Sequence, residues 1–153
     1  MSDSSDDLDA LVGRIGEPFE FVVETGKVRE FARATGALDA HPLTDPAPFA
    51  PPTFLAAGTL WSPSEMMLLE RVGGDRSRML HGEQEYRFPA GPPRAGARLN
   101  ALPRVAAAYE RAGRRGGRLR FVTIATEYRD EQGGLVAEAF MTVVETERAP
   151  EGA

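Results

Sequence analysis

Apolar and polar positions alternate through most of the second half of the chain. Within residues 118–128, Val122 and Ile124 alternate with Phe121 and Thr123, and a period of two is typical of a β-strand whose two faces meet different surroundings. Runs of this kind predict four strands joined by glycine-rich turns, at residues 79–88, 97–109, 118–128 and 135–145.

The first half of the chain begins with one short strand and one helix. Residues 19–23 are aromatic and β-branched, which favours a strand. Val28 and Phe31 then fall at helical spacing, so that a helix is predicted over residues 25–36, with Thr25 as its N-terminal cap.

A proline-rich segment separates this helix from a longer apolar one. Residues 37–52 contain Asp, Ala and several prolines, which oppose both helix and sheet and predict a loop. Residues 53–72 are mostly apolar, and Pro63 divides them, with Ser62 capping a second helix in which Pro63 takes the first helical position. This order of elements predicts an α+β fold in which a curved antiparallel sheet wraps around a central helix.

Length and charge indicate one domain between two short tails. A chain of 153 residues suits a single hydrophobic core. We expect a disordered acidic tail at residues 1–12, the domain at residues 13–148 and a C-terminal tail at residues 149–153. Four Asp in the first ten residues account for most of the net charge of −5, so the domain is nearly neutral, which argues against nucleic-acid binding.

Two further features of composition concern the compartment. The chain has no cysteine, which excludes disulfides and thiolate metal sites and permits a reducing environment. Its apolar runs are shorter than the roughly 20 residues that cross a bilayer. We therefore expect a cytoplasmic protein that does not bind membranes.

Four segments of the sequence resemble one known family. Residues 39–45 read Asp-Ala-His-Pro-Leu-Thr-Asp and residues 50–54 read Ala-Pro-Pro-Thr-Phe, while residues 81–86 read His-Gly-Glu-Gln-Glu-Tyr and residues 92–96 form a Pro-x-x-x-Gly turn. Together they resemble the N-terminal, FAS1-like type of the MaoC-like dehydratases and hydratases. These enzymes act on (R)-3-hydroxyacyl thioesters and carry an Asp-x-Asn-Pro-aliphatic-His loop. The resemblance extends from Gly13 to Glu147.

This resemblance implies a fold, a reaction and a set of partners. The fold would be a single hot-dog domain. The reaction would be the reversible loss of water from a (3R)-3-hydroxyacyl thioester of CoA or acyl-carrier protein, giving a trans-2-enoyl thioester, in fatty acid or polyketide metabolism. Such a hydro-lyase needs no metal and no cofactor. The family also implies a homodimer, or a heterodimer with another hot-dog chain.

The resemblance further implies which residues form the site. Asp39 and His41 would be the catalytic pair, because a His beside an Asp supplies the base for the Cα proton and the acid for the departing hydroxyl. Thr44 stands where the family has its His, and His41 stands where it has Asn. The substrate-binding residues would be Pro52, Thr53, Phe54, Trp61, His81 and Gly82.

Three alternatives remain open at this stage. Some chains of the superfamily lack the catalytic pair and shape the acyl tunnel for an active partner, so the chain could be a catalytically silent subunit. A carboxylate on the central helix, here Glu65, would instead suit thioester hydrolysis. A basic cluster at a hairpin turn could meet CoA phosphates or an acidic carrier protein, or be a solvated turn; it comprises Arg111, Arg114, Arg115, Arg118 and Arg120.

Overall fold

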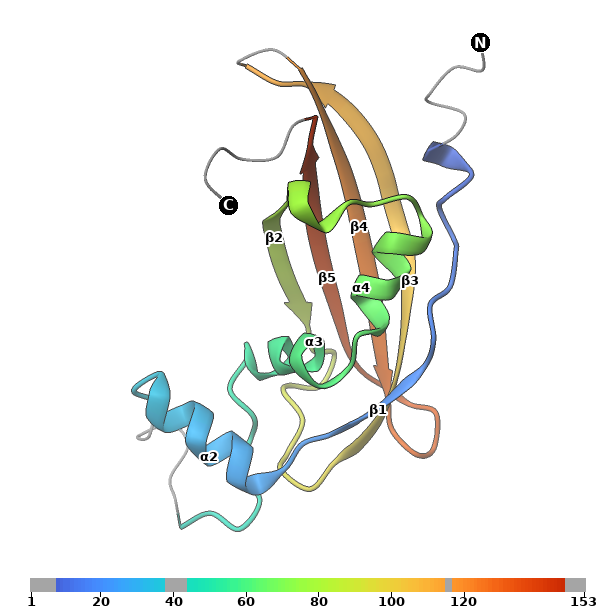
Figure 1. The fold of residues 1–153 in the computed structure, drawn as a ribbon. Coiled ribbons are helices and arrows are strands. Elements are labelled where there is room, and N and C mark those ends of the chain that lie inside the picture. The colour runs from blue at the N-terminus through green and yellow to red at the C-terminus, as the bar shows by residue number, and fades with distance from the viewer. Residues whose placement is uncertain (1–7, 38–43, 115–116, 148–153) are drawn as a thin grey trace.

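The computed structural model describes residues 8–37, 44–114 and 117–147, which form one five-stranded antiparallel sheet with helices on one face (Figure 1). The strands lie in the order β1-β3-β4-β5-β2. Their bounds are β1 (Phe19–Val22), β2 (Met79–Arg87), β3 (Arg98–Ala112), β4 (Arg118–Arg129) and β5 (Leu135–Thr146). The predicted α+β class and all five predicted strands are confirmed.

The helical segments follow β1 and precede β2 in the chain. They are α2 (Thr25–Ala34), the 3-10 turn η1 (Phe54–Ala57), α3 (Gly58–Trp61), α4 (Ser64–Arg71) and the 3-10 turn η2 (Arg76–Arg78). In Figure 1, α4 lies across β3 and β4, whereas α2 lies beyond the end of the sheet. We call the sheet face that α4 covers the inner face. No helix in the described ranges is long and apolar enough to span a membrane.

The strand register decides which side chains point towards α4. Tyr86 on β2 pairs with Ala139 on β5, which pairs with Thr126 on β4, which pairs with Pro103 on β3. Val122, Ile124, Thr126 and Tyr128 of β4 are all buried, as the alternation in the sequence predicts for the inner face.

The core has two apolar clusters, one at each end of the sheet. The first lies between β1, α2 and η1 and contains Phe21, Val28, Phe54, Leu99 and Tyr128 among others. The second lies beneath α4 and includes Leu68, Leu69, Val105, Ile124 and Met141. It also includes Leu8, so the packed part of the chain begins before the expected domain start at residue 13. Of the expected tails, residues 1–7 and 149–153 lie outside the described residues.

Two predicted helix caps are placed differently in the structure. Glu24 rather than Thr25 occupies the N-cap of α2, and no side chain caps that helix. Pro63 does divide α3 from α4, but it is the N-cap of α4 rather than its first residue. The Ser62 hydroxyl still accepts a hydrogen bond from the backbone N–H of Ser64, at 3.3 Å. Pro63 therefore separates the helices as predicted, but α4 begins at Ser64, one residue later than expected.

Candidate functional site

The predicted catalytic pair follows α2 in the sequence. Asp39 and His41 belong to residues 38–43, which lie outside the described residues. On the near side, the N–H of Ala37 donates to the carbonyl of Ala32 at 2.8 Å. On the far side, Arg29 of α2 donates to the carbonyl of Asp45 at 3.1 Å. Both flanks of the predicted catalytic loop are thus fixed to the same helix.

Asp45 forms a turn at the far side of this loop. Its carboxylate accepts the N–H of Ala47 at 2.9 Å, an arrangement in which an Asp side chain replaces a backbone hydrogen bond. Thr44, which takes the position of the family His, is exposed.

Four aromatic side chains gather beside α2, and we call them the aromatic cluster: Phe21, Phe31, Phe54 and Trp61. Trp61 stacks on Phe21 with ring centroids 5.0 Å apart. Phe54 meets Phe21, Phe31 and Trp61 edge-on, at centroid distances of 6.0, 5.7 and 5.8 Å. Contacts of this kind hold η1 and α3 against both β1 and α2.

The predicted substrate-binding residues near this cluster differ in their exposure. Phe54 is 1% exposed, so its ring supports the site from within. Pro52 and Thr53 are exposed just before η1, and Trp61 is 45% exposed on α3. Pro52, Thr53 and Trp61 are therefore accessible to a ligand, whereas Phe54 is buried and contacts the Trp61 ring.

The other two predicted residues lie on β2 and apart from the aromatic cluster. His81 is exposed, and its Nε2 lies 3.2 Å from Oε1 of Gln84. Gly82 lies at a β-bulge, where the register with β5 shifts between His81 and Glu83. A Cβ at Gly82 would lie 2.9 Å from Cγ2 of Val144, so no larger residue fits there without movement. In Figure 1 it is the Arg87 end of β2 that approaches α3.

A buried polar group of side chains lies beneath the first turn of α4. Glu65 is 6% exposed, and its Oε1 accepts a hydrogen bond of 2.5 Å from the hydroxyl of Thr126 on β4. The hydroxyl of Tyr86 is buried without a hydrogen-bond partner among the described residues. The hydroxyl of Tyr128 lies where a Cβ on Gly58 would be 3.1 Å away, so it packs beneath α3. We call Glu65, Tyr86, Thr126 and Tyr128 the polar core.

Burial changes the ionisation of the polar core. It raises the pKa of Glu65 above its usual value, an effect that the hydrogen bond from Thr126 partly offsets. Burial and then the nearby Glu65 raise the pKa of Tyr86 to about 12. Burial, Glu65 and Tyr86, in that order, also raise the pKa of Tyr128. Each group therefore favours its uncharged form.

The spacing of apolar residues in the sequence indicates that Glu65 is buried. Glu65 is followed by Leu68, Leu69 and Val72 at the i+3, i+4 and i+7 positions, and all four are buried. This spacing places Glu65 on the apolar face of α4. A carboxylate that activates water for thioester hydrolysis must reach the substrate, whereas Glu65 binds Thr126 inside the core.

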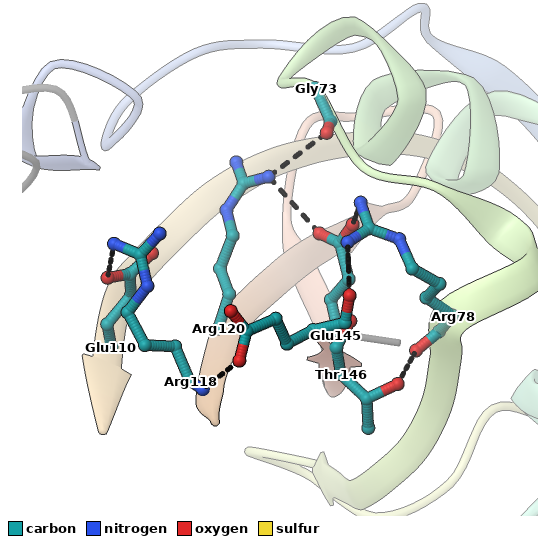
Figure 2. Close-up of a pocket in the computed structure, with 8 residues that line it drawn as sticks. Gly73, Arg78, Glu110, Arg118, Arg120, Glu145 and Thr146 are labelled. Carbon is teal, nitrogen blue, oxygen red and sulfur yellow. Dashed lines mark hydrogen bonds and ion pairs between the residues drawn. The ribbon is translucent and has the colours of Figure 1, made fainter. Parts of the chain in front are cut away.

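Three arginines of the basic cluster predicted at the hairpin, Arg111, Arg118 and Arg120, contact other residues of the chain, and Arg115 lies outside the described residues. A pocket of about 190 Å³ lies at this end of the sheet. Figure 2 shows the arginines and glutamates that line it. Arg120 binds Glu145 at 3.3 Å and the carbonyls of Val72 and Gly73, while Arg118 lies 3.5 Å from Glu110.

Two further arginines at this end of the sheet also have partners. Arg78 binds the other oxygen of Glu145 at 2.6 Å, and Arg111 lies over the ring of Tyr109, with its Cζ 5.0 Å from the centroid. Because the charges around this cavity compensate one another, the cavity has no surplus of positive charge for a phosphate. Across the described ranges, no group of three or more His, Asp or Glu is arranged to hold a metal ion.

Comparison with known proteins gives a family and several relatives. A family model described as the FAS1-like dehydratase domain region matches residues 10–139. The UPF0336 protein SCO4636 of Streptomyces coelicolor is 34% identical over 146 residues, which cover 88% of this chain and 92% of the relative.

Two solved structures extend the similarity to the fold. The C-terminally truncated HadBC complex of Mycobacterium tuberculosis, a (3R)-hydroxyacyl-ACP dehydratase, matches with a TM-score of 0.67 and 25% identity, over 88% of this chain and 96% of that one. The ChsH1–ChsH2 complex of the same organism matches with a TM-score of 0.66 over 99% of this chain and 95% of that one, at 13% identity, and so shows the fold alone. The expected hot-dog fold is confirmed.

Proposed function

The chain belongs to the family of the FAS1-like dehydratase domain region, and from this premise we propose that it takes part in the reversible dehydration of (3R)-3-hydroxyacyl thioesters in the cytoplasm. The products would be a trans-2-enoyl thioester and water, with the acyl group carried by CoA or acyl-carrier protein. One observation carries the proposal: the match to a dehydratase family covers residues 10–139, from the segment before β1 into β5.

The proposed chemistry uses the two residues of the predicted catalytic loop. The His41 imidazole removes the Cα proton, and Asp39 protonates the hydroxyl that leaves Cβ as water. Histidine suits this role because its ordinary pKa lies near neutrality. The attachment of both loop flanks to α2 supports the proposal, because a catalytic pair needs rigid support.

The proposed acyl-binding surface adjoins the end of α2. Pro52, Thr53 and Trp61 would contact the acyl thioester, and the buried Phe54 would hold their backbone in place. Trp61 offers a partly exposed ring that is already stacked on Phe21, so little side-chain freedom is lost when a ligand binds.

A direct assay tests the reaction. The purified chain is mixed with crotonyl-CoA and longer trans-2-enoyl-CoA esters, and loss of the conjugated double bond and release of free thiol are followed in parallel. The proposal expects hydration without thiol release. Thiol release without hydration would show a thioesterase instead.

Thr44 supports a second candidate function, that of a catalytically silent subunit. It takes the position of the family His, and it is an exposed loop residue. In this case the chain would bind the acyl group and an active hot-dog partner would perform the chemistry. Hydration only after a MaoC-like partner is added would favour this candidate.

The partner in either case would be another hot-dog chain, and β2 is our candidate for the strand that meets it. β2 is an edge strand of nine residues, and unpaired edge strands present free backbone donors and acceptors. Leu80 is 47% exposed on this strand. We assign His81 and Gly82 to the part of the acyl site that forms with the second chain.

The oligomeric state can be measured independently of activity. Light scattering after gel filtration should give a dimer for the chain alone or with its partner. Glu83→Pro, which removes a backbone donor from β2, should shift the equilibrium towards monomer. Thr25→Pro, placed at the first position of α2, is the control and should leave the dimer intact. A Glu83→Pro protein that stays folded and dimeric would exclude β2 as the contact.

A further inference from the structure

The polar core contains a carboxyl group in a place where a charge has no compensation. Glu65 is 6% exposed, and Thr126, its hydrogen-bond partner, is 1% exposed. Within the described ranges, Glu65 forms no ion pair with an arginine or lysine. An ionised carboxylate loses its hydration in such a place without gaining a cation.

Each element around Glu65 contributes an uncharged or acidic neighbour. β4 contributes Thr126 and Tyr128, and β2 contributes Tyr86, whose buried hydroxyl has no partner in the described part of the chain. The segment before β1 contributes Glu17, which binds Ser64 through its backbone carbonyl and Arg71 through its carboxylate, at the surface. No neighbour therefore favours a charge on Glu65, except the Thr126 hydroxyl through its hydrogen bond.

A short series of contacts joins the polar core to the aromatic cluster. The Tyr128 ring lies 5.7 Å from that of Phe21, and Phe21 stacks on Trp61 at 5.0 Å. Along the chain, Trp61 ends α3 and Glu65 lies in the first turn of α4, with only three residues between them. A displacement of that turn therefore acts directly on Trp61.

We propose that Glu65 is a proton-dependent switch: with its proton it holds the first turn of α4 against Thr126, Tyr86 and Tyr128, and without it that turn leaves the sheet and moves Trp61. The switch depends on packing and hydration and does not require that the chain be catalytically active. Its closed form would be the one that keeps Trp61 stacked on Phe21.

The chain provides its own reporter for this movement. Trp61 is the one tryptophan in the sequence, so intrinsic tryptophan fluorescence reports on this site alone. The full chain is titrated from about pH 5 to about pH 9, a range above the ordinary pKa of glutamate. The proposal expects the emission of Trp61 to shift to longer wavelength as the pH rises, while far-ultraviolet circular dichroism still shows the sheet.

Three variants test whether ionisation of Glu65 causes the shift in Trp61 emission. Glu65→Gln has no proton to lose and should abolish the shift, whereas Glu70→Gln removes an exposed carboxylate of the same helix and should retain it. Thr126→Val removes the hydrogen bond that favours the charged form and should move the midpoint up by roughly one pH unit.

Two results would overturn the proposal. One is constant Trp61 emission in the unmodified chain. The other is an unchanged transition in Glu65→Gln, which would assign it to His41 or His81, since both remain in that variant. If Glu65→Gln does not fold, Thr126→Val provides the test instead. A midpoint of the Trp61 emission shift in Thr126→Val at or below that of the unmodified chain would then overturn the proposal.

Discussion

Arg120 and Glu145 form an ion pair across β4 and β5 (Figure 2), and the same guanidinium also binds the carbonyls of Val72 and Gly73, which follow α4. The side chain of Arg120 is 17% exposed and that of Glu145 is 8% exposed. A cation at the C-terminal end of a helix is also favoured by the helix dipole. The pair thus fixes the end of α4 to the sheet.

We expect Arg120→Met to destabilise the protein by about 2 kcal/mol, because it leaves one oxygen of the buried Glu145 carboxylate and two carbonyls without their donor. Urea denaturation measures the change in the free energy of unfolding. Arg98→Met removes a partner of Glu20 from a pair whose side chains are more than half exposed, and it should cost about 0.5 kcal/mol or less. Equal losses in the two variants would contradict the structural role of Arg120.

Gly82 and Gly26 should respond in opposite ways to replacement by alanine. A Cβ at Gly82 would meet Cγ2 of Val144 at 2.9 Å and the carbonyl of Thr142 at 3.2 Å, so Gly82→Ala should cost about 1–3 kcal/mol of stability. A Cβ at Gly26, in α2, would meet nothing within 4 Å, and Gly26→Ala should stabilise by about 0.5 kcal/mol. Thermal unfolding of both variants checks the two signs. A neutral Gly82→Ala would mean that the bulge in β2 has room to relax.

The pH dependence of stability follows from the raised pKa of Glu65. A carboxyl whose pKa is higher in the folded state contributes stability that is fully present below its unfolded pKa and is lost as the pH rises through the folded value. The free energy of unfolding of the unmodified chain, minus that of Glu65→Gln, should therefore fall as the pH rises above the usual range for glutamate. A difference that stays constant or increases with pH would show that Glu65 is ionised in the folded protein.

Local patterns in the sequence predicted most of the fold. The alternation from Phe121 to Tyr128 identified both faces of β4, and Pro63 marked the division between two helices. The interactions that the sequence did not reveal join distant positions. Arg120 binds a carbonyl 48 residues earlier in the chain, and Glu65 binds Thr126, 61 residues later, so no local spacing reports them.

The candidate site was predictable only in part. Thr53 and Trp61 were both predicted to bind substrate, and both are exposed. The family resemblance grouped His81 with them, although His81 is some 15–20 Å along β2 from Arg87, the end of the strand near α3, at about 3.3 Å per residue. A sequence motif does not record that a residue lies on an edge strand of a sheet.

The most direct test of the proposed function is the hydration of trans-2-enoyl-CoA by His41→Ala, compared with His81→Ala, each alone and with a MaoC-like partner. If His41 is the base, His41→Ala should lose at least about 100-fold in kcat, and His81→Ala should keep kcat while raising KM. Full activity of His41→Ala would contradict the assignment of the catalytic pair. The absence of hydration by the unmodified chain, alone and with the partner, would contradict the proposed function itself.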